Sequence, residues 1–176
     1  LFSPHPDDDV ISMGGTFQRL VDQGHDVHVA YQTSGNIAMH DYDALRYVEL
    51  MLEFGETQKT IEEPERKRLK KIIQFLRKKN FADVDSPEVR SIKGLIRRGE
   101  ARSGARFTGL DDDHIHFLDM PFYETGSTRK KPLGDEDIQI IMNLMEQVKP
   151  HQVYAAGDLA DPHGTHRVCL DAIFEA

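Results

Sequence analysis

Apolar residues recur along this chain in two different spacings, and the two alternate from the first residues to the last. In "HDVHVAYQTS" (25–34) every second position is apolar over Val27, Val29 and Tyr31, which is typical of a strand. Between residues 138 and 148 the apolar residues recur at the three- and four-residue spacing of a helix. The same criteria predict further strands, one ending at Ser3 and others over 114–122 and 151–157, and further helices, one opening at Gly14-Gly15, one through Leu45, Val48 and Leu52, and others over 62–80, 91–108 and 164–175.

This alternation predicts one kind of architecture. Strands joined through helices run parallel, and the helices cover both faces of the sheet. We therefore expect an α/β fold, a Rossmann-like three-layer sandwich with a mostly parallel sheet. Ligands of such sheets bind beyond the carboxyl ends of the strands. Three segments should meet there, namely "PHPDDD", "TSGN" and "GDLADPHGTH".

Length and charge narrow the class of protein. The 176 residues, 39% of them hydrophobic, suffice for one core, so we expect a single domain over 1–176. The formal charge of −8 argues against a nucleic-acid or membrane-surface binder, because phosphates would be repelled over most of the surface. No apolar run approaches the ~20 residues that span a bilayer. The lone Cys169 excludes an internal disulfide and favours a reducing compartment, so we expect a cytoplasmic location.

Both ends of the chain look cut. It starts on Leu1-Phe2, without Met, and stops inside the helix-like pattern "RVCLDAIFEA", with no Gly or Pro after it. We therefore expect the chain to be a piece of a longer protein.

The stretch "PHPDDD" places three adjacent aspartates behind a histidine held between two prolines. Pro4 and Pro6 each keep the preceding residue extended, so His5 and Asp8 can converge as the chain turns into the helix. A divalent cation would offset the repulsion among the carboxylates, and a nitrogen–oxygen donor set suits Zn²⁺ or Fe²⁺. An acidic helix start is the alternative, but it explains one aspartate and leaves His5 and the two prolines unexplained.

The later stretch "DPHGTH" brings two more histidines to the same sheet edge. His163 and His166 are three residues apart at a predicted helix start, so they can face the same way. One of them would complete a three-ligand set with His5 and Asp8 and leave a fourth position for water, as in hydrolytic metal sites. Two ordinary surface histidines are the alternative.

These motifs resemble those of a known family. "PHPDDD" followed by "GGT", and the late "DPHGTHR", are similar to the signature of the GlcNAc-PI de-N-acetylase (PIG-L/LmbE) family, a His-Pro-Asp-Asp-Glu/Asp run with a later His-x-x-His. The middle stretch "IRRGEARSGARFTGLDDDHIHFLDMP" also resembles that family, including its Arg97-x-x-Glu100 and Gly109 spacing.

The resemblance implies a zinc-dependent deacetylase that acts on N-acetylglucosamine units. By that resemblance His5, Asp8 and His166 would hold the metal, and Asp7 would be the general base. His163 would stabilise the oxyanion and protonate the leaving amine. This division suits amide hydrolysis, which needs a nucleophile at neutral pH, stabilisation of a tetrahedral oxyanion and a proton for the leaving group.

The chain departs from the family pattern in two places. Members commonly carry Pro-Asp between the late histidines, where this chain has Gly164-Thr165. Asp161 or Asp158 would then have to orient His163. The chain also stops soon after this motif, so part of the substrate wall is expected outside it.

Other residues carry weaker signals. Asn36, with Thr33 and Ser34, either binds sugar hydroxyls or turns the chain. Arg97 or Arg98 either holds a substrate phosphate or is an exposed helix arginine. Three histidines at strand entrances, away from the expected site, are interpreted as structural, namely His114, His116 and His151.

The function expected from these observations is removal of an N-acetyl group from an amino-sugar or other N-acetylated small molecule. A metal hydrolase of another amide or an ester is one alternative. A sugar-binding or regulatory domain, appended to another amino-sugar enzyme, is the other. Retention of Asp7 beside the three ligands favours an enzyme, because a binding domain needs no general base. The sequence does not indicate an oligomeric state.

Overall fold

The computed structural model of the chain describes residues 1–80, 83–158 and 160–176. Its sheet has three parallel strands in the order β1 (Phe2–Ser3), β2 (Val29–Tyr31) and β3 (Ile115–Phe117). Phe2 pairs with Ala30, and Val29 pairs with Ile115. Each strand is shorter than its alternating pattern predicts. The predicted strand over 151–157 appears as one parallel bridge between Phe2 and Ala155, on the free side of β1.

Six α-helices are defined in the described part of the chain, with two short 3₁₀ turns, η1 (Asn36–Ala38) and η2 (Asp112–His114). The helices are α1 (Asp8–Asp22), α2 (Asp41–Gln58), α3 (Glu63–Lys78), α4 (Pro87–Phe107), α5 (Asp135–Val148) and α6 (Thr165–Glu175). None of these helices has both the length and the apolar character needed to cross a bilayer. Residue 159, inside the predicted segment 157–166, lies outside the described residues.

The predicted start of the first helix is wrong. The glycine pair at 14–15 lies inside α1, which begins six residues earlier at Asp8, directly after Asp7 in the N-cap position. An acidic residue at the N-cap and two more in the first turn are favourable there, because their charge faces the positive end of the helix dipole. The second and third aspartates of "PHPDDD" are therefore helical residues.

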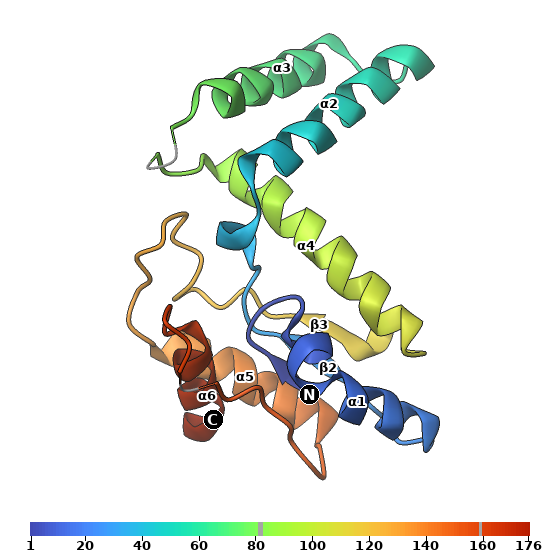
Figure 1. The fold of residues 1–176 in the computed structure, drawn as a ribbon, viewed down its shortest axis with the longest axis vertical. Helices are drawn as coiled ribbons and strands as arrows, with labels where there is room; N and C mark the ends of the chain where they lie inside the picture. Colours follow the sequence, from blue (N-terminus) through green and yellow to red (C-terminus); the bar gives the residue numbers. More distant parts are fainter. Residues whose placement is uncertain (81–82, 159) are drawn as a thin grey trace.

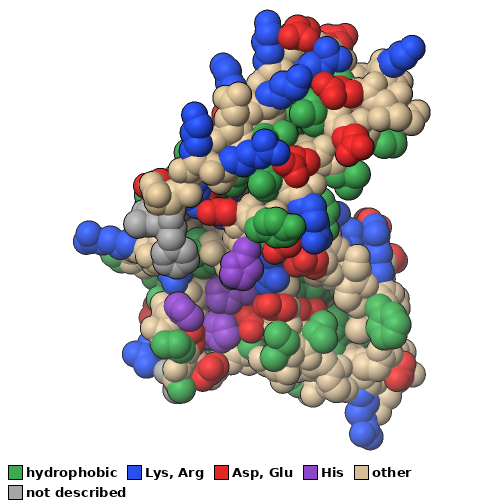
Figure 2. Space-filling view, turned by 45° about the horizontal axis from the view of Figure 1, so that its top comes forward, with side chains coloured by type: hydrophobic (Ala, Val, Ile, Leu, Met, Phe, Trp, Pro, Cys, Tyr) green, Lys and Arg blue, Asp and Glu red, His purple; other side chains and the backbone are tan. Residues whose placement is uncertain are grey.

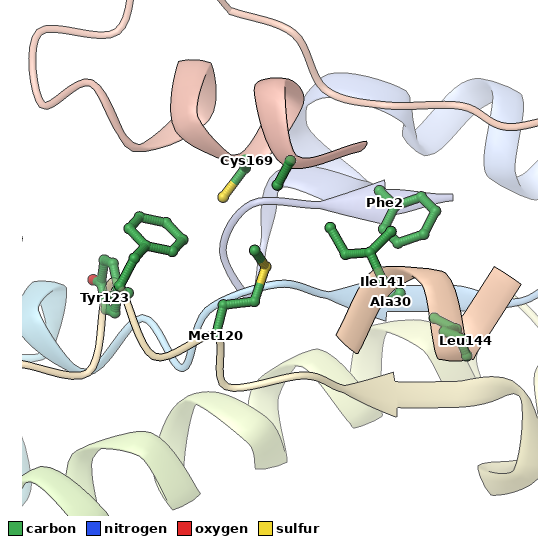
Figure 3. Packing of buried hydrophobic residues seen from close by; sticks show 9 residues of the cluster. Phe2, Ala30, Met120, Tyr123, Ile141, Leu144 and Cys169 are labelled. Atoms are coloured by element: carbon green, nitrogen blue, oxygen red, sulfur yellow. The ribbon is translucent and has the colours of Figure 1, made fainter. Parts of the chain in front are cut away.

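Helices cover both faces of the small sheet. On one face Phe2 and Ala30 pack against Ile141 and Leu144 of α5 and Cys169 of α6 (Figure 3). On the other face Val29 and Tyr31 pack with Phe17 of α1 and with Ala101 and Ala105 of α4. The chain thus has an α/β fold with a small parallel sheet, while the complete Rossmann-like sandwich stays a prediction.

Helices α2 and α3 form a hairpin at the end of the molecule away from the sheet, and α4 runs from this hairpin to the strands (Figure 1). A cluster of buried charges fixes the junction. The ammonium of Lys93 lies 2.6 Å from Asp41 and 2.7 Å from Asp85, and Lys79 contacts the same two carboxylates. Since these pairs join the start of α2 to α4, they help to hold α4 in place along the sheet.

Candidate metal centre

The loop after β1 is held by its own hydrogen bonds. The Ser3 hydroxyl donates to the carbonyl of His5 at 2.6 Å and accepts from the backbone N–H of Asp9 at 2.9 Å. The backbone N–H of His5 donates to Oδ2 of Asp8 at 2.9 Å. These bonds bring the His5 side chain and the first turn of α1 together at the carboxyl edge of the sheet.

His166 reaches the same place from the other end of the chain. It lies in the first turn of α6, after Gly164, whose φ of 69° is in the left-handed region that glycine adopts without strain. The carboxylate of Asp161 accepts from the backbone N–H of His166 at 3.2 Å and so fixes this first turn. Figure 2 shows histidine side chains gathered beside acidic ones on this face of the molecule.

Three donor atoms converge where these segments meet. Nδ1 of His5 lies 3.1 Å from Oδ2 of Asp8 and 3.2 Å from Nε2 of His166, and the last two atoms are 3.2 Å apart. The three side chains are 20%, 11% and 15% exposed, so the cluster is largely shielded but still open to solvent. These three residues form a group that can hold a metal ion.

The geometry of this cluster fits a zinc-sized cation. Ligands bonded to tetrahedral zinc at about 2.0–2.1 Å lie about 3.3 Å from one another, close to the observed separations. Without a cation, a ring N–H of His5 or His166 would be shared between the Asp8 oxygen and the other ring nitrogen, whereas a cation can accept a lone pair from all three atoms. Burial would raise the pKa of Asp8, but the hydrogen bond from His5 and the charge of His166 lower it below its ordinary value. The carboxylate is therefore available as a ligand.

Asp7 lies beside this cluster and is held by α4. Its Oδ2 accepts from Nη2 of Arg97 at 2.8 Å, and the carboxylate is 43% exposed. Arg97 also contacts Glu100 at 3.2 Å. A Cβ atom at Gly35 would lie 2.8 Å from Pro6 and 3.2 Å from the Arg97 guanidinium. Because glycine has no side chain, the segments that carry Gly35, Pro6 and Arg97 can pack closely together. Arg97 is therefore near the site, as a partner of Asp7.

His163 is placed differently from His166. Its side chain is 79% exposed and lies 3.2 Å, through Nδ1, from Oδ1 of Asp161, which is 8% exposed. Burial would raise the pKa of Asp161, but hydrogen bonds from the His163 and His166 backbone and from the His163 ring lower it to about 2. Asp161, one of two residues expected to replace the missing Asp, thus contacts His163, while Asp158 accepts from the backbone N–H of Ala160.

The third aspartate of the motif, Asp9, points into the protein. It is 1% exposed, and its Oδ2 accepts from the Tyr31 hydroxyl at 2.7 Å. Burial raises the pKa of Asp9. This aspartate joins α1 to the carboxyl end of β2, which holds the loop that carries His5.

The "TSGN" segment is buried and hydrogen-bonded inside the protein. Asn36 donates to Glu124 at 2.8 Å and to the Ser34 hydroxyl at 2.7 Å. The hydroxyl of Thr33 donates to the carbonyl of Pro4 at 2.7 Å. The Thr33 contact supports the segment that precedes His5, and the Asn36 contact joins the loop after β2 to the loop after β3. Glu124 is a participant that the sequence patterns do not single out.

The loop over 123–134 also reaches the site, although its glycines, proline and short basic run predict an exposed connection. The ring of Tyr123 packs edge-on against His5, with 5.6 Å between ring centroids. The ammonium of Lys130 donates to the carbonyl of His163 at 3.2 Å. The one signal for these residues is topological, because the loop follows the carboxyl end of β3.

The fold and the three converging donors define an α/β protein with a candidate single-metal centre at the carboxyl edge of its sheet. The family described as PIG-L, GlcNAc-PI de-N-acetylase, matches residues 1–176, and the chain belongs to this family. Membership implies a hydrolase of the deacetylase type.

A relative from Bacteroides thetaiotaomicron is 52% identical over 177 residues and is named as a glucosamine-6-phosphate deaminase-like protein. The match covers 100% of this chain and 27% of the relative, so the chain spans about a quarter of that protein's length. No solved structure shows a significant match to the chain.

Proposed function

We propose that this chain is a zinc-dependent N-deacetylase that removes the acetyl group from an N-acetylglucosamine-type substrate. The observation that carries the proposal is the triangle of donor atoms from His5, Asp8 and His166, with sides of 3.1–3.2 Å. These three residues would hold the ion, and Fe²⁺ suits the same donor set. When bound, zinc supplies Lewis-acid polarisation of a carbonyl and a water nucleophile at neutral pH.

Asp7 is the proposed general base. One of its oxygens is engaged by Arg97, and the carboxylate is partly exposed beside the ligand triangle. The guanidinium fixes the orientation of the carboxylate, so Asp7 can take a proton from the attacking water. For Arg97 the sequence leaves open a contact with a substrate phosphate or an exposed position on the helix, and its side chain is 15% exposed. Its contacts favour a role through Asp7.

His163 is the proposed acid. Its ring is exposed and is oriented by Asp161, so its Nε2 is the atom left to face a substrate. As an imidazolium it would stabilise the tetrahedral oxyanion and then protonate the departing amine. Asn36, the other expected substrate contact, supports the loop through Glu124, and direct binding of sugar hydroxyls by Asn36 stays a prediction.

The amino-sugar class of the substrate is supported by the comparisons. The family is described by a de-N-acetylase of N-acetylglucosamine, and the name of the Bacteroides relative refers to an amino-sugar phosphate. Since the chain covers 27% of that relative, fusion to another amino-sugar enzyme is part of the proposal. A cytoplasmic location and the lack of a nucleic-acid partner also stay predictions.

The test combines metal content with release of a primary amine from N-acetylglucosamine and its 6-phosphate. Zinc close to one equivalent at the proposed centre is expected, and Asp7→Asn should keep that zinc while kcat falls about 10²–10⁴-fold. Asp171→Asn, an exposed carboxylate on α6, is the control and should match the wild type.

Three outcomes would contradict the proposal in different ways. An undiminished kcat in Asp7→Asn would show that Asp7 is not the general base. Binding of the sugar without amine release would favour the sugar-binding domain. Release of acid from an ester or another amide, with no action on the sugar, would favour the other metal hydrolase.

A further inference from the structure

A second group of histidines lies at the opposite, amino edge of the sheet. His28 directly precedes β2, His114 ends η2 immediately before β3, and His116 lies within β3. Because β2 and β3 are parallel neighbours, their starts lie side by side, and the side chains of Asp26 and His28 meet those of His114 and His116.

Three donor atoms of this group face one another. Oδ1 of Asp26 lies 3.0 Å from Nε2 of His114 and 3.6 Å from Nε2 of His28. The two imidazole rings are 4.5 Å apart between centroids. Asp26, His28 and His114 can each offer one ligand atom, and these atoms lie within 4.8 Å of one another.

The other ring nitrogen of each histidine is already held. Nδ1 of His28 lies 3.0 Å from Nε2 of His116. Nδ1 of His114 is hydrogen-bonded to the carboxylate of Asp111. Histidine ligands of metals usually have their second nitrogen fixed in this way, by a carboxylate or another acceptor, which leaves the first nitrogen with a lone pair for the ion. Here Nε2 is the remaining nitrogen of both rings, and both point toward Asp26.

We propose that Asp26, His28 and His114 form a second binding site for a divalent transition metal of the zinc class. Two imidazoles and one carboxylate suit that class of ion. The Asp26 side chain is 79% exposed, so an ion can enter directly from solvent. The site stands apart from the proposed catalytic centre, and bound metal would tie the start of β2 to the start of β3.

An ion pair without metal is the competing account. In that case a proton on His114 would bridge Asp26 and Asp111, and no cation would be needed. The two accounts differ in whether added Zn²⁺ binds and stabilises the folded protein.

The test uses protein stripped of metal by a chelator and titrated with Zn²⁺ alone. The double variant His28→Gln/His114→Gln should take up one zinc equivalent fewer than the wild type, and His5→Gln/His166→Gln should lack the other. His151→Gln, which changes an exposed histidine at the start of the last predicted strand, should lose none. Counting differences from the wild type keeps any metal bound elsewhere out of the comparison.

Thermal unfolding gives a second readout that does not involve activity. In the His5→Gln/His166→Gln background, saturating Zn²⁺ should raise the unfolding midpoint by about 5–10 °C, because an ion that binds only the folded state stabilises it. Adding Asp26→Asn, which changes an exposed side chain, should abolish most of that shift. Unchanged zinc uptake in His28→Gln/His114→Gln, or no zinc-dependent shift, would overturn the second site and leave the ion pair.

Discussion

The two histidine–aspartate groups lie at opposite ends of the same three strands, and they differ in how they are built. The carboxyl-edge group joins residues as far apart as His5 and His166, separated by 161 positions, and its donors are at most 20% exposed. The amino-edge group joins Asp26 and His114, 88 positions apart, and its carboxylate is 79% exposed.

The difference in exposure and surroundings indicates what each of the two histidine–aspartate groups is suited to do. A shielded triangle beside Asp7 and an exposed His163 has room for chemistry on a substrate that enters from one side. In the amino-edge group the carboxylate of Asp26 is exposed, and the neighbouring Asp111 and His116 are already engaged by the two ligand histidines, so this group is suited to binding an ion and linking two strands. The first group is therefore the proposed centre of hydrolysis and the second a proposed site of stabilisation.

The largest expected effect separates the two groups by activity. His166→Gln removes one of three ligands, so zinc should be lost from the carboxyl edge and amine release should fall to the uncatalysed background. Zinc at the amino edge should remain. Metal content and amine release, with His151→Gln as control, measure this, and full activity in His166→Gln would reverse the assignment of the two groups.

A smaller effect is expected from the residues around the carboxyl-edge group. His163→Ala should keep zinc and lower kcat about 10²–10⁴-fold, because only proton transfer and oxyanion stabilisation are removed. Loss of zinc in His163→Ala, with zinc retained in His166→Gln, would show that the two histidines exchange roles.

Asp161→Asn tests the carboxylate that both late histidines share. Since it orients the His163 ring and accepts from the His166 backbone, its replacement should lower both the zinc affinity and kcat, each by about 10–100-fold. Asp158→Asn is the matched control. An equal effect of both variants would contradict a specific role for Asp161.

The carboxyl edge also depends on the buried contact between Tyr31 and Asp9. Tyr31→Phe would leave Asp9 buried without the hydroxyl that it accepts from, at a cost of about 1–3 kcal/mol in the free energy of unfolding. Denaturant unfolding measures the loss, and Tyr42→Phe, at 72% exposed, should change little. An unchanged unfolding midpoint in Tyr31→Phe would mean that the Asp9 carboxylate does not depend on the Tyr31 hydroxyl as its hydrogen-bond donor.

The smallest effect distinguishes a proton from a metal ion at the amino edge. In chelator-treated protein the hydrogen bond to Asp111 raises the pKa of His114, and Asp26 adds to this. A raised pKa stabilises the fold below the ordinary value of about 6.5 and ceases to do so as the pH rises through the folded value. His114→Gln should therefore lower the unfolding midpoint by about 1–2 °C at pH 5.5 and not at pH 9. A larger fall of the unfolding midpoint at pH 9 than at pH 5.5 would contradict a raised pKa of His114.

The convergence at the carboxyl edge could be predicted because it follows from topology. The loops after parallel strands meet at one edge, so "PHPDDD" and "DPHGTH" were expected together, and His5, Asp8 and His166 do lie within hydrogen-bonding distance. The glycine pair predicts the wrong start for the first helix because Asp7 at the N-cap and the acidic first turn begin it at Asp8.

Other parts of the site gave no periodic signal. Tyr123 and Glu124 lie in a loop whose position depends on tertiary packing, and no spacing in the sequence places them beside His5 or Asn36. The sequence gives no sign of a functional role for His28, because it occupies an ordinary polar position in the alternating pattern of a strand. Their positions at strand entrances favour a structural role for His114 and His116, and the register of β2 and β3 shows that they face His28.

The origin of the carboxyl-edge ligands has a consequence for how the protein is made. Synthesis proceeds from the amino end, so His5 and Asp8 emerge from the ribosome well before His166, which lies 161 positions after His5. An incomplete nascent chain therefore holds two of the three ligands and lacks the geometry for tight metal capture. Hydrolytic competence would arise only once α6 has been translated and has docked, which delays the reactive centre until all the segments that carry its ligands have been made.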